Sequence, residues 1–501
     1  MINKNIKCTI AIVAMALVFG SCKKDFLELE PRGTTLEDNF YKNEKEMMEG
    51  LIAVYDVMQW GNSGGYTMKM PLLSAASDDT WAGGSSASDQ PSWVAYDNFT
   101  LNSFIGPQGG LWSKNFSGIN RANLILSKID KSTNLSAGFK SRATAEAKFL
   151  RAYFYFDLVR WFGNVPLILK ELLPSELYTQ TQVAPAQIYA QIEKDLRDAI
   201  TGLPATVGAS EKGRVSLGAA KAQLAKVLLY QNENSKMAEA ATLFEDINRV
   251  GNPYGYALMA KYEDIFNPAN KFNSESVLEI PHSNAAAWGD WGWINGGEGN
   301  MAPQFIGMDT YVGDGFAAGW GFCPVTLDLV NVLKNDPRFA ATIIDGAALK
   351  AGGATYNARY QNTDYFIKKY APIKSYRSSI GTPELNWPIN EIEIRLADTY
   401  LMQAEALLRG GGSATRAKEL LDAVRARVGL PSVPATLDNV YAERRLELAT
   451  EGHRFFDLVR TGRAVAVLGP LGYRAGKSEY LPIPQTEIDV TKGIIKQNPG
   501  Y

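Results

Sequence analysis

The sequence feature that most constrains the fold is a set of segments in which apolar residues recur every three or four positions. In such a segment one face of an α-helix is apolar and has to be buried against another element. Where the breaks between segments are short, we expect antiparallel helix pairs, the building unit of helical solenoids. No clear repeat of about 34 residues accompanies them. The segments are residues 43–60, 111–129, 143–162, 185–200, 216–230, 236–250, 391–409, 414–428 and 437–460.

One short motif occurs twice, each time at the end of a long apolar helical segment and just before a glycine. Residues 156–160 and 456–460 both read Phe-Asp-Leu-Val-Arg. Asp and Arg three positions apart share a helix face and can form an ion pair there, while the apolar residues face inward. We therefore interpret the motif as two similar helix ends in the core, and not as two copies of a site.

Two long stretches lack helical periodicity, namely residues 61–110 and 251–388. Alternating apolar residues predict short strands at 277–280 and 365–370 in the second stretch. Loops of this length are uncommon inside a compact domain, and those that occur are usually functional. The two stretches are therefore the first places to look for a ligand site.

Both stretches carry aromatic residues among Gly, Ser, Asn and Asp, where neighbours in sequence cannot cover a large ring. Flat rings suit sugars, because a pyranose presents an apolar C–H face, and nearby polar side chains can bond its hydroxyls. We expect each stacking contact to contribute about 1 kcal/mol, as an aromatic pair does. For a single ring, packing onto the scaffold is an equal alternative, but the cluster as a whole favours a ligand surface. The predicted ligand-binding residues are Asp78, Trp81, Trp93, Tyr96, Asn98, Trp288, Trp291, Trp293, Asn295 and Trp320, with Asp79, Asp290 and Asp314 as further polar candidates.

The charge balance and the histidine count argue against several other functions. The chain has 51 Lys and Arg against 53 Asp and Glu, whereas a nucleic-acid binder needs a basic face. His282 and His453 are the two histidines, so a histidine metal site or a Ser/His/Asp triad has little to draw on. His453 lies in an apolar helical context and is interpreted as a core residue. We expect no cofactor and no catalysis, although composition leaves open a glycosidase, which needs only two carboxylates.

The N-terminus has the layout of an export signal. Lys4 and Lys7 precede an apolar run at residues 8–19, which is too short to span a membrane, and Gly20, Ser21 and Cys22 follow. Small residues directly before a cysteine resemble a bacterial lipobox, so we expect cleavage after Ser21 and a lipid on Cys22. An ordinary secretory signal is the alternative. Cys323 is then the lone free thiol of the mature chain.

Several segments, in order along nearly the whole mature chain, resemble the SusD/RagB-like nutrient-binding lipoproteins of Bacteroidetes outer membranes. The segments are the start Cys-Lys-Lys-Asp-Phe-Leu-Glu at 22–28, the helical stretches 146–160, 395–406 and 443–458, the turn at 163–167, and the ending at 481–485 and 497–501. The resemblance implies a scaffold of tetratricopeptide-like helix pairs with a loop-rich insertion that carries the ligand site. It also implies a partner, a SusC-like TonB-dependent β-barrel transporter, and an oligosaccharide ligand. Some relatives of similar fold take peptides instead.

We therefore predict a mostly α fold, with a tetratricopeptide-like scaffold and a long loop-rich insertion containing short strands. The expected parts are a signal peptide (1–21), a lipidated tether (22–42), a helical scaffold with an aromatic loop at 61–110 (43–250), the ligand-binding insertion (251–388) and a C-terminal scaffold part with an extended tail (389–501). The expected function is non-catalytic glycan binding at the cell surface and delivery to the transporter. A peptide-binding relative, a surface glycosidase and a helical adaptor without a small ligand remain alternatives.

Overall fold

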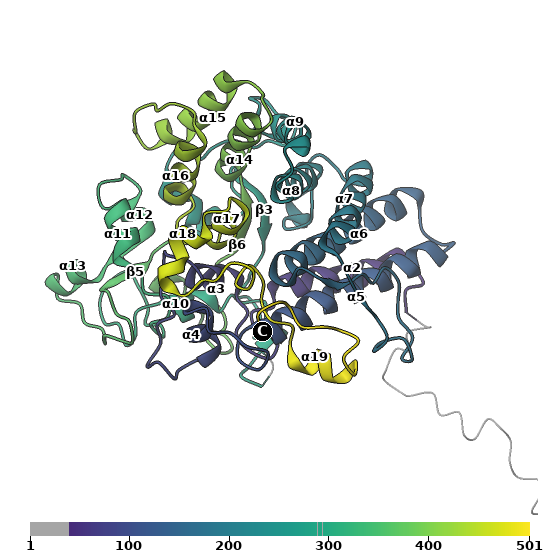
Figure 1. Ribbon diagram of the computed structural model, residues 1–501, viewed down its shortest axis with the longest axis horizontal. Coiled ribbons are helices and arrows are strands. Elements are labelled where there is room, and N and C mark those ends of the chain that lie inside the picture. The colour runs from purple at the N-terminus through teal and green to yellow at the C-terminus, as the bar shows by residue number, and fades with distance from the viewer. Residues whose placement is uncertain (1–39, 288, 293) are drawn as a thin grey trace, which may run out of the picture.

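The computed structural model describes residues 40–287, 289–292 and 294–501. Its long helices pack side by side in an arc that begins with the pair α2 and α5 and passes through α6, α7, α8 and α9 to α14, α15 and α16 (Figure 1). This mostly helical arrangement of paired helices with a few short strands confirms the predicted fold class. The bounds are α2 Glu44–Gln59, α5 Gln108–Lys131, α6 Ala137–Phe162, α7 Pro185–Gly202, α8 Leu217–Tyr230, α9 Met237–Asn248, α14 Leu396–Arg409, α15 Ala414–Arg427 and α16 Leu437–Glu447.

Helix α6 is the central element of the first half of the arc, between α5 and α7. The Ser136 side chain caps its start by accepting a hydrogen bond from the Phe139 N–H, and Gly163 ends it with a φ of +67°. Its second half is apolar on most sides, and residues such as Phe149 and Phe154 are fully buried. The predicted buried helix is therefore confirmed, with a start six residues earlier than its apolar pattern indicates.

Two predicted helices differ from the structure because backbone pairing and turns interrupt them. The segment 391–409 begins as strand β6 (Glu391–Arg395), which pairs antiparallel with β3 (Ser276–Ile280), and becomes helical from Leu396. The alternation Glu-Ile-Glu-Ile-Arg buries Ile392 and Ile394, as a strand requires. The segment 437–460 divides into α16 and α17 (Arg454–Arg460), because Thr450 and Gly452 adopt φ values of +65° and +80° between them.

The two stretches without helical periodicity contain short elements. Within 61–110 lie α3 (Lys69–Ala75) and α4 (Pro91–Asp97), so the prediction that this stretch is not helical is wrong in part. The second stretch contains α10 (Ala302–Ile306), α11 (Leu327–Leu333), α12 (Phe339–Thr342) and α13 (Gly346–Ala351). Strands were predicted at 277–280 and 365–370, and they are present as β3 and as β5 (Tyr365–Ile367), which pairs with β4 (Ile343–Asp345). The remaining elements are β1 (Val165–Pro166), its partner β2 (Gln182–Val183), α18 (Ala464–Leu468) and α19 (Gln485–Val490).

The two copies of Phe-Asp-Leu-Val-Arg lie at the ends of α6 and α17 and pack against each other. Each copy forms the predicted internal ion pair, Asp157 with Arg160 and Asp457 with Arg460. The Arg160 guanidinium lies over the Phe456 ring at 4.5 Å. The prediction of two similar helix ends in the core is confirmed.

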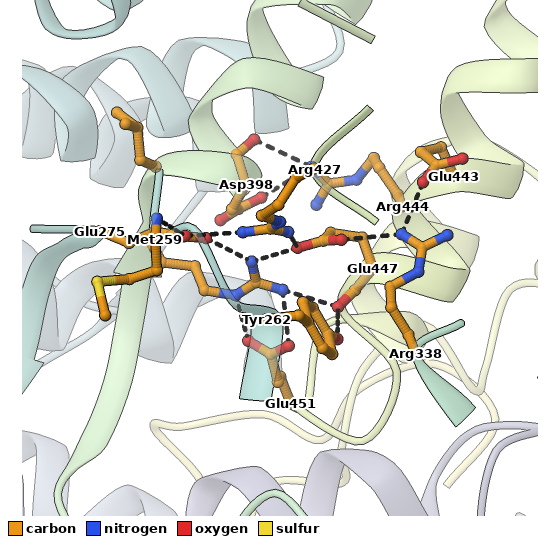
Figure 2. A network of polar contacts seen from close by, with 12 residues as sticks. Met259, Tyr262, Glu275, Arg338, Asp398, Arg427, Glu443, Arg444, Glu447 and Glu451 are labelled. Carbon is orange, nitrogen blue, oxygen red and sulfur yellow. Dashed lines mark hydrogen bonds and ion pairs between the residues drawn. The ribbon is translucent and has the colours of Figure 1, made fainter. Parts of the chain in front are cut away.

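A buried ionic network joins the insertion to the C-terminal helices, and Figure 2 shows its centre around Glu447 of α16. The fully buried Glu447 carboxylate accepts hydrogen bonds from Arg338 at 2.8 Å and Arg395 at 2.6 Å, and also from Arg427. Arg338 belongs to the insertion, in the turn between α11 and α12, so this carboxylate connects three separate parts of the chain. The network comprises five basic and five acidic side chains, namely Arg338, Lys369, Arg395, Arg425, Arg427, Glu275, Asp336, Glu443, Glu447 and Glu451.

Within the described ranges, no helix is both long enough and apolar enough to cross a membrane.

Candidate ligand-binding site

Several aromatic residues from the two loop-rich stretches meet in one place, beside α10 and α4 in the lower part of Figure 1. The buried part of this group is a stack of Phe305 and Phe322, whose ring centroids are 4.0 Å apart with an angle of 15° between the planes. The Trp93 ring lies 4.4 Å from Phe305 on the same layer. These rings form a rigid apolar base, because close-packed side chains leave little room for rearrangement.

Three more exposed rings lie next to this base, and we call Tyr66, Trp291 and Trp320 the aromatic platform. The Trp320 ring is 5.8 Å from Trp291 and 6.2 Å from Tyr66, with interplanar angles of 34° and 43°. Trp291 is 52% exposed, while Tyr66 and Trp320 are half-buried against Phe305. The three rings thus form a shallow, tilted surface and not a closed pocket.

Close backbone packing holds Trp320 in place. Its N–H donates to the Gln304 carbonyl at 2.9 Å, and the next residue, Gly321, pairs with Gly84 at 3.1 Å. Gly319 lies so close to Gly307 that a Cβ atom there would come within 2.4 Å of the Gly307 Cα. Only glycine allows this approach, so the glycines of the sequence fix the position of the ring that follows them.

Polar groups lie around the platform. Partial burial and the nearby Asp89 carboxylate raise the pKa of the Tyr66 hydroxyl, which therefore stays a neutral hydrogen-bond donor at pH 7. The Arg359 guanidinium pairs with Asp309 at 2.8 Å. A Cβ atom on Gly321 would lie 2.9 Å from the Arg359 Cγ, which places the Arg359 side chain beside Gly321, the residue that follows Trp320. Flat rings next to hydroxyl, carboxylate and guanidinium groups are suited to binding a sugar ring and its hydroxyls.

The structure brings together only some of the predicted site residues. Trp291 and Trp320 meet in the platform, as predicted, but Trp93 and Tyr96 do not reach the surface. Both are 1% exposed in α4, where Trp93 packs on Phe305 and Tyr96 packs on Trp161. Their spacing of three residues in a helix turns both rings into the core, so the predicted ligand role of these two residues is wrong.

The polar candidates lie in several places. Asp78 and Asp79 are buried and paired with arginines, which gives them a structural role in addition to any contact with a ligand. Asn98 is exposed at the end of α4, and Asp314 is exposed in the turn closed by the Tyr311 hydroxyl. Asp290 accepts a hydrogen bond from the Gly292 N–H at 2.7 Å. Trp288, Trp293 and the side chain of Asn295 lie outside the part of the chain that the structure describes.

Tyr66 is the platform residue that the sequence does not reveal. It follows Gly64 and Gly65 in a short glycine- and serine-rich turn without another aromatic residue beside it. The only signal is the same one that marks the tryptophans, a large ring that its sequence neighbours cannot cover.

The two histidines are neutral and the cysteine thiol is protonated at pH 7. Burial lowers the pKa of His282 to about 3 and that of His453 to about 4, so both are neutral. His453 lies at the N-cap of α17 and not inside a helix, which corrects that part of its prediction. Cys323 is fully buried with its Sγ 3.6 Å from the Pro71 carbonyl, and burial raises the pKa of its thiol.

The molecule is a helical arc that carries a fixed aromatic platform beside loop-rich segments. Comparison with known proteins identifies the family. A family model described as "SusD family" matches residues 295–476, and one described as "Starch-binding associating with outer membrane" matches residues 25–229. The chain belongs to the SusD-like family.

Its relatives include proteins named for their glycan ligands. A solved laminarin-binding SusD-like protein is 47% identical, with 92% of this chain and 100% of that chain covered and a TM-score of 0.87. Surface glycan-binding protein A of Bacteroides thetaiotaomicron, solved with laminarihexaose, is 31% identical over 91% of this chain and 99% of its own, with a TM-score of 0.85. SusD-like protein P25 of Formosa agariphila is 25% identical over 98% of this chain and 99% of the relative.

Proposed function

We propose that this protein binds a laminarin-type glucan at the cell surface on the aromatic platform. It does not hydrolyse the glucan but delivers it to a SusC-like TonB-dependent β-barrel transporter in the outer membrane. The observation that carries the proposal is the platform itself, three partly exposed rings held on a buried aromatic stack. The names of the two solved relatives support the choice of ligand.

The geometry suits a chain of glucose units better than a single sugar. Neighbouring rings of the platform are 5.8 and 6.2 Å apart and inclined to each other, so successive units of a curved oligosaccharide can rest on different rings. If each ring contributes about 1 kcal/mol, removal of one ring weakens binding about fivefold. Trp320 contacts both other rings and should matter most.

Delivery to the transporter and anchoring rest on the N-terminus and the family. The layout of residues 1–22 supports cleavage after Ser21 and a lipid on Cys22, and the family description supports association with the outer membrane. Co-purification of the full chain with a SusC-like barrel from outer membranes, and its loss from membranes after Cys22→Ser, test this part.

Calorimetry with laminarihexaose tests the ligand site. Trp320→Ala is expected to weaken binding about tenfold or more, and Trp291→Ala and Tyr66→Ala about fivefold each. Tyr178→Ala is the matched control, because Tyr178 is 55% exposed in the loop between β1 and β2 and lies outside the platform. Unchanged affinity in all three platform variants would refute the assignment, and release of reducing ends from bound laminarin would refute binding without hydrolysis.

A further inference from the structure

A separate hollow lies beside Trp81, in the segment that links α3 to Gly84. Its volume is about 620 Å³, which is in the range of small-molecule sites. We call it the Trp81 cleft, and its apolar side is formed by Trp81, Leu327, Val467 and Leu471. The Trp81 N–H donates to the Pro324 carbonyl at 3.0 Å, and Thr80 pairs with Val325, so the backbone that carries the ring is held in place.

Two of the three arginines in this cleft are already neutralised. Arg454 forms a two-pronged hydrogen bond to Asp78 at 2.8 and 2.9 Å. Arg445 contacts Asp78 at 2.8 Å, and its remaining contacts go to Asp79 and Asp328. These two guanidinium groups therefore hold α16 and α17 to the end of α3, and because they are paired with three carboxylates they offer no excess positive charge to a ligand.

The third arginine, Arg463, differs from them. It lies in the turn between α17 and α18, half-buried, with its guanidinium over the Tyr441 ring at 5.4 Å. Among the described residues, no carboxylate oxygen comes within 4.0 Å of its nitrogens. The cleft is therefore lined by a flat indole ring, an apolar wall and one guanidinium group that forms no direct ion pair with a described carboxylate.

We propose that the Trp81 cleft is a second binding site, and that it takes an acidic sugar, a pyranose that carries a carboxylate on its ring. The C–H face of the sugar would lie on Trp81, and the carboxylate would pair with Arg463, since guanidinium groups bind carboxylates in a planar, two-pronged geometry. Thr363 and Asp328 line the same cleft and can bond sugar hydroxyls. A uronic acid unit presents the apolar face and the anion on one rigid ring.

A peptide fits this cleft less well. Extended peptides bind by adding a strand to an open sheet edge or by laying a helix into a long groove. The walls here come from the starts and ends of α11, α16, α17 and α18 and from the Trp81 segment, and none of the three described sheets contributes a lining residue. The site goes beyond the proposed function and does not depend on it, because laminarin is a neutral glucan and its proposed site is the aromatic platform.

Calorimetry with a galacturonic acid tetramer, and with the same tetramer after reduction of its carboxyl groups, tests the proposal. The acidic tetramer is expected to bind at least tenfold more tightly than the reduced one, with affinity falling as salt concentration rises. Arg463→Gln and Trp81→Ala should each weaken binding about tenfold. Leu327→Glu adds a carboxylate at the rim and should also weaken it; Leu327 is 55% exposed, so this variant leaves the core unchanged.

Trp320→Ala is the control that separates the two sites. It should leave binding of the acidic tetramer unchanged while it weakens binding of laminarihexaose. Equal binding of the acidic and reduced tetramers would overturn the proposal. So would full affinity in Arg463→Gln, loss of affinity in Trp320→Ala, or tighter binding of a tetrapeptide with a free carboxyl terminus. Failure of laminarihexaose to bind would affect only the proposed function.

Discussion

The substitution Glu447→Gln tests whether the buried ionic network holds the insertion to the helical scaffold. The change keeps the size and shape of the side chain and removes its charge. In the native protein the carboxylate accepts hydrogen bonds from Arg338, Arg395 and Arg427, and the side chain is fully buried. Because five basic side chains of the network face five acidic ones, the variant leaves one buried positive charge without a counterpart.

The expected cost is large for a single substitution. Removing one partner from a buried ion pair typically destabilises a protein by about 3–5 kcal/mol, since the remaining charge stays out of water. Part of this is recovered here, because the glutamine oxygen can still accept a hydrogen bond from one of the arginines. We therefore expect Glu447→Gln to lower the free energy of unfolding by about 3 kcal/mol at pH 7.

Denaturant unfolding followed by circular dichroism measures this effect. Glu239→Gln is the matched control, because Glu239 pairs with Arg197 on the surface, where both side chains are nearly half exposed. Such a surface pair contributes about 1 kcal/mol or less. The three arginines outweigh the effect of burial and hold the pKa of Glu447 far below its usual value of 4.5. The difference between wild type and Glu447→Gln should therefore be complete above pH 4.5 and shrink as the pH falls below it.

A loss in Glu447→Gln no larger than that in Glu239→Gln would refute this reasoning. It would mean that the neighbouring carboxylates take over the three guanidinium groups without cost. A loss that stays constant from pH 7 to pH 3 would refute the electrostatic explanation, since the Glu447 carboxylate, which titrates in that range in the unfolded chain, is the one ionisable group by which the two proteins differ.

Three further predictions concern stability. Burial raises the pKa of Glu391 from 4.5 to about 7, which corresponds to a cost of about 3 kcal/mol at most for ionising it in the folded protein. That cost is absent below pH 4.5 and complete above pH 7. Glu391→Gln should therefore stabilise the protein at pH 8 but not at pH 4, and thermal unfolding at the two pH values measures this. Gly118→Ala should destabilise the protein by about 1–3 kcal/mol in urea unfolding, because its Cβ would lie 2.3 Å from the Phe154 ring. An unchanged free energy of unfolding would contradict the packing of α5 on α6. Gly138 has open space around it in α6, so Gly138→Ala should instead stabilise the protein by up to about 1 kcal/mol in the same measurement. A loss of stability in this variant would contradict the open position.

The helical part of the fold follows from the sequence wherever one apolar face continues without interruption. The long helices α5 to α9 begin and end within a few residues of their predicted bounds, apart from the start of α6. The wrong predictions lie where contacts with distant parts of the chain decide the local structure. Glu391–Arg395 joins a strand that is distant in sequence, and Gly452 turns the chain where its Cβ would lie 3.1 Å from the Met70 Cα. Neither contact is visible in local periodicity.

The site is predictable only in outline. Aromatic rings among glycines indicated Trp291 and Trp320, which the structure brings together, and their ligand role stays a prediction. The same rule failed for Trp93 and Tyr96, since Pro91 starts a short helix that turns both rings inward. It also passed over Tyr66, whose place in the platform depends on contact with Phe305 and Trp320 from a segment more than two hundred residues away.

The burial of Cys323 has a practical consequence for following ligand capture. A thiol that is enclosed and held in its protonated form reacts slowly with alkylating reagents. A chain expressed from Lys23 onward lacks Cys8 and Cys22, so a cysteine introduced at the exposed Ser86, close to Asp89 and the platform, would be its one reactive sulfur. A single fluorophore attached there would report the arrival of a sugar chain at the proposed platform in real time.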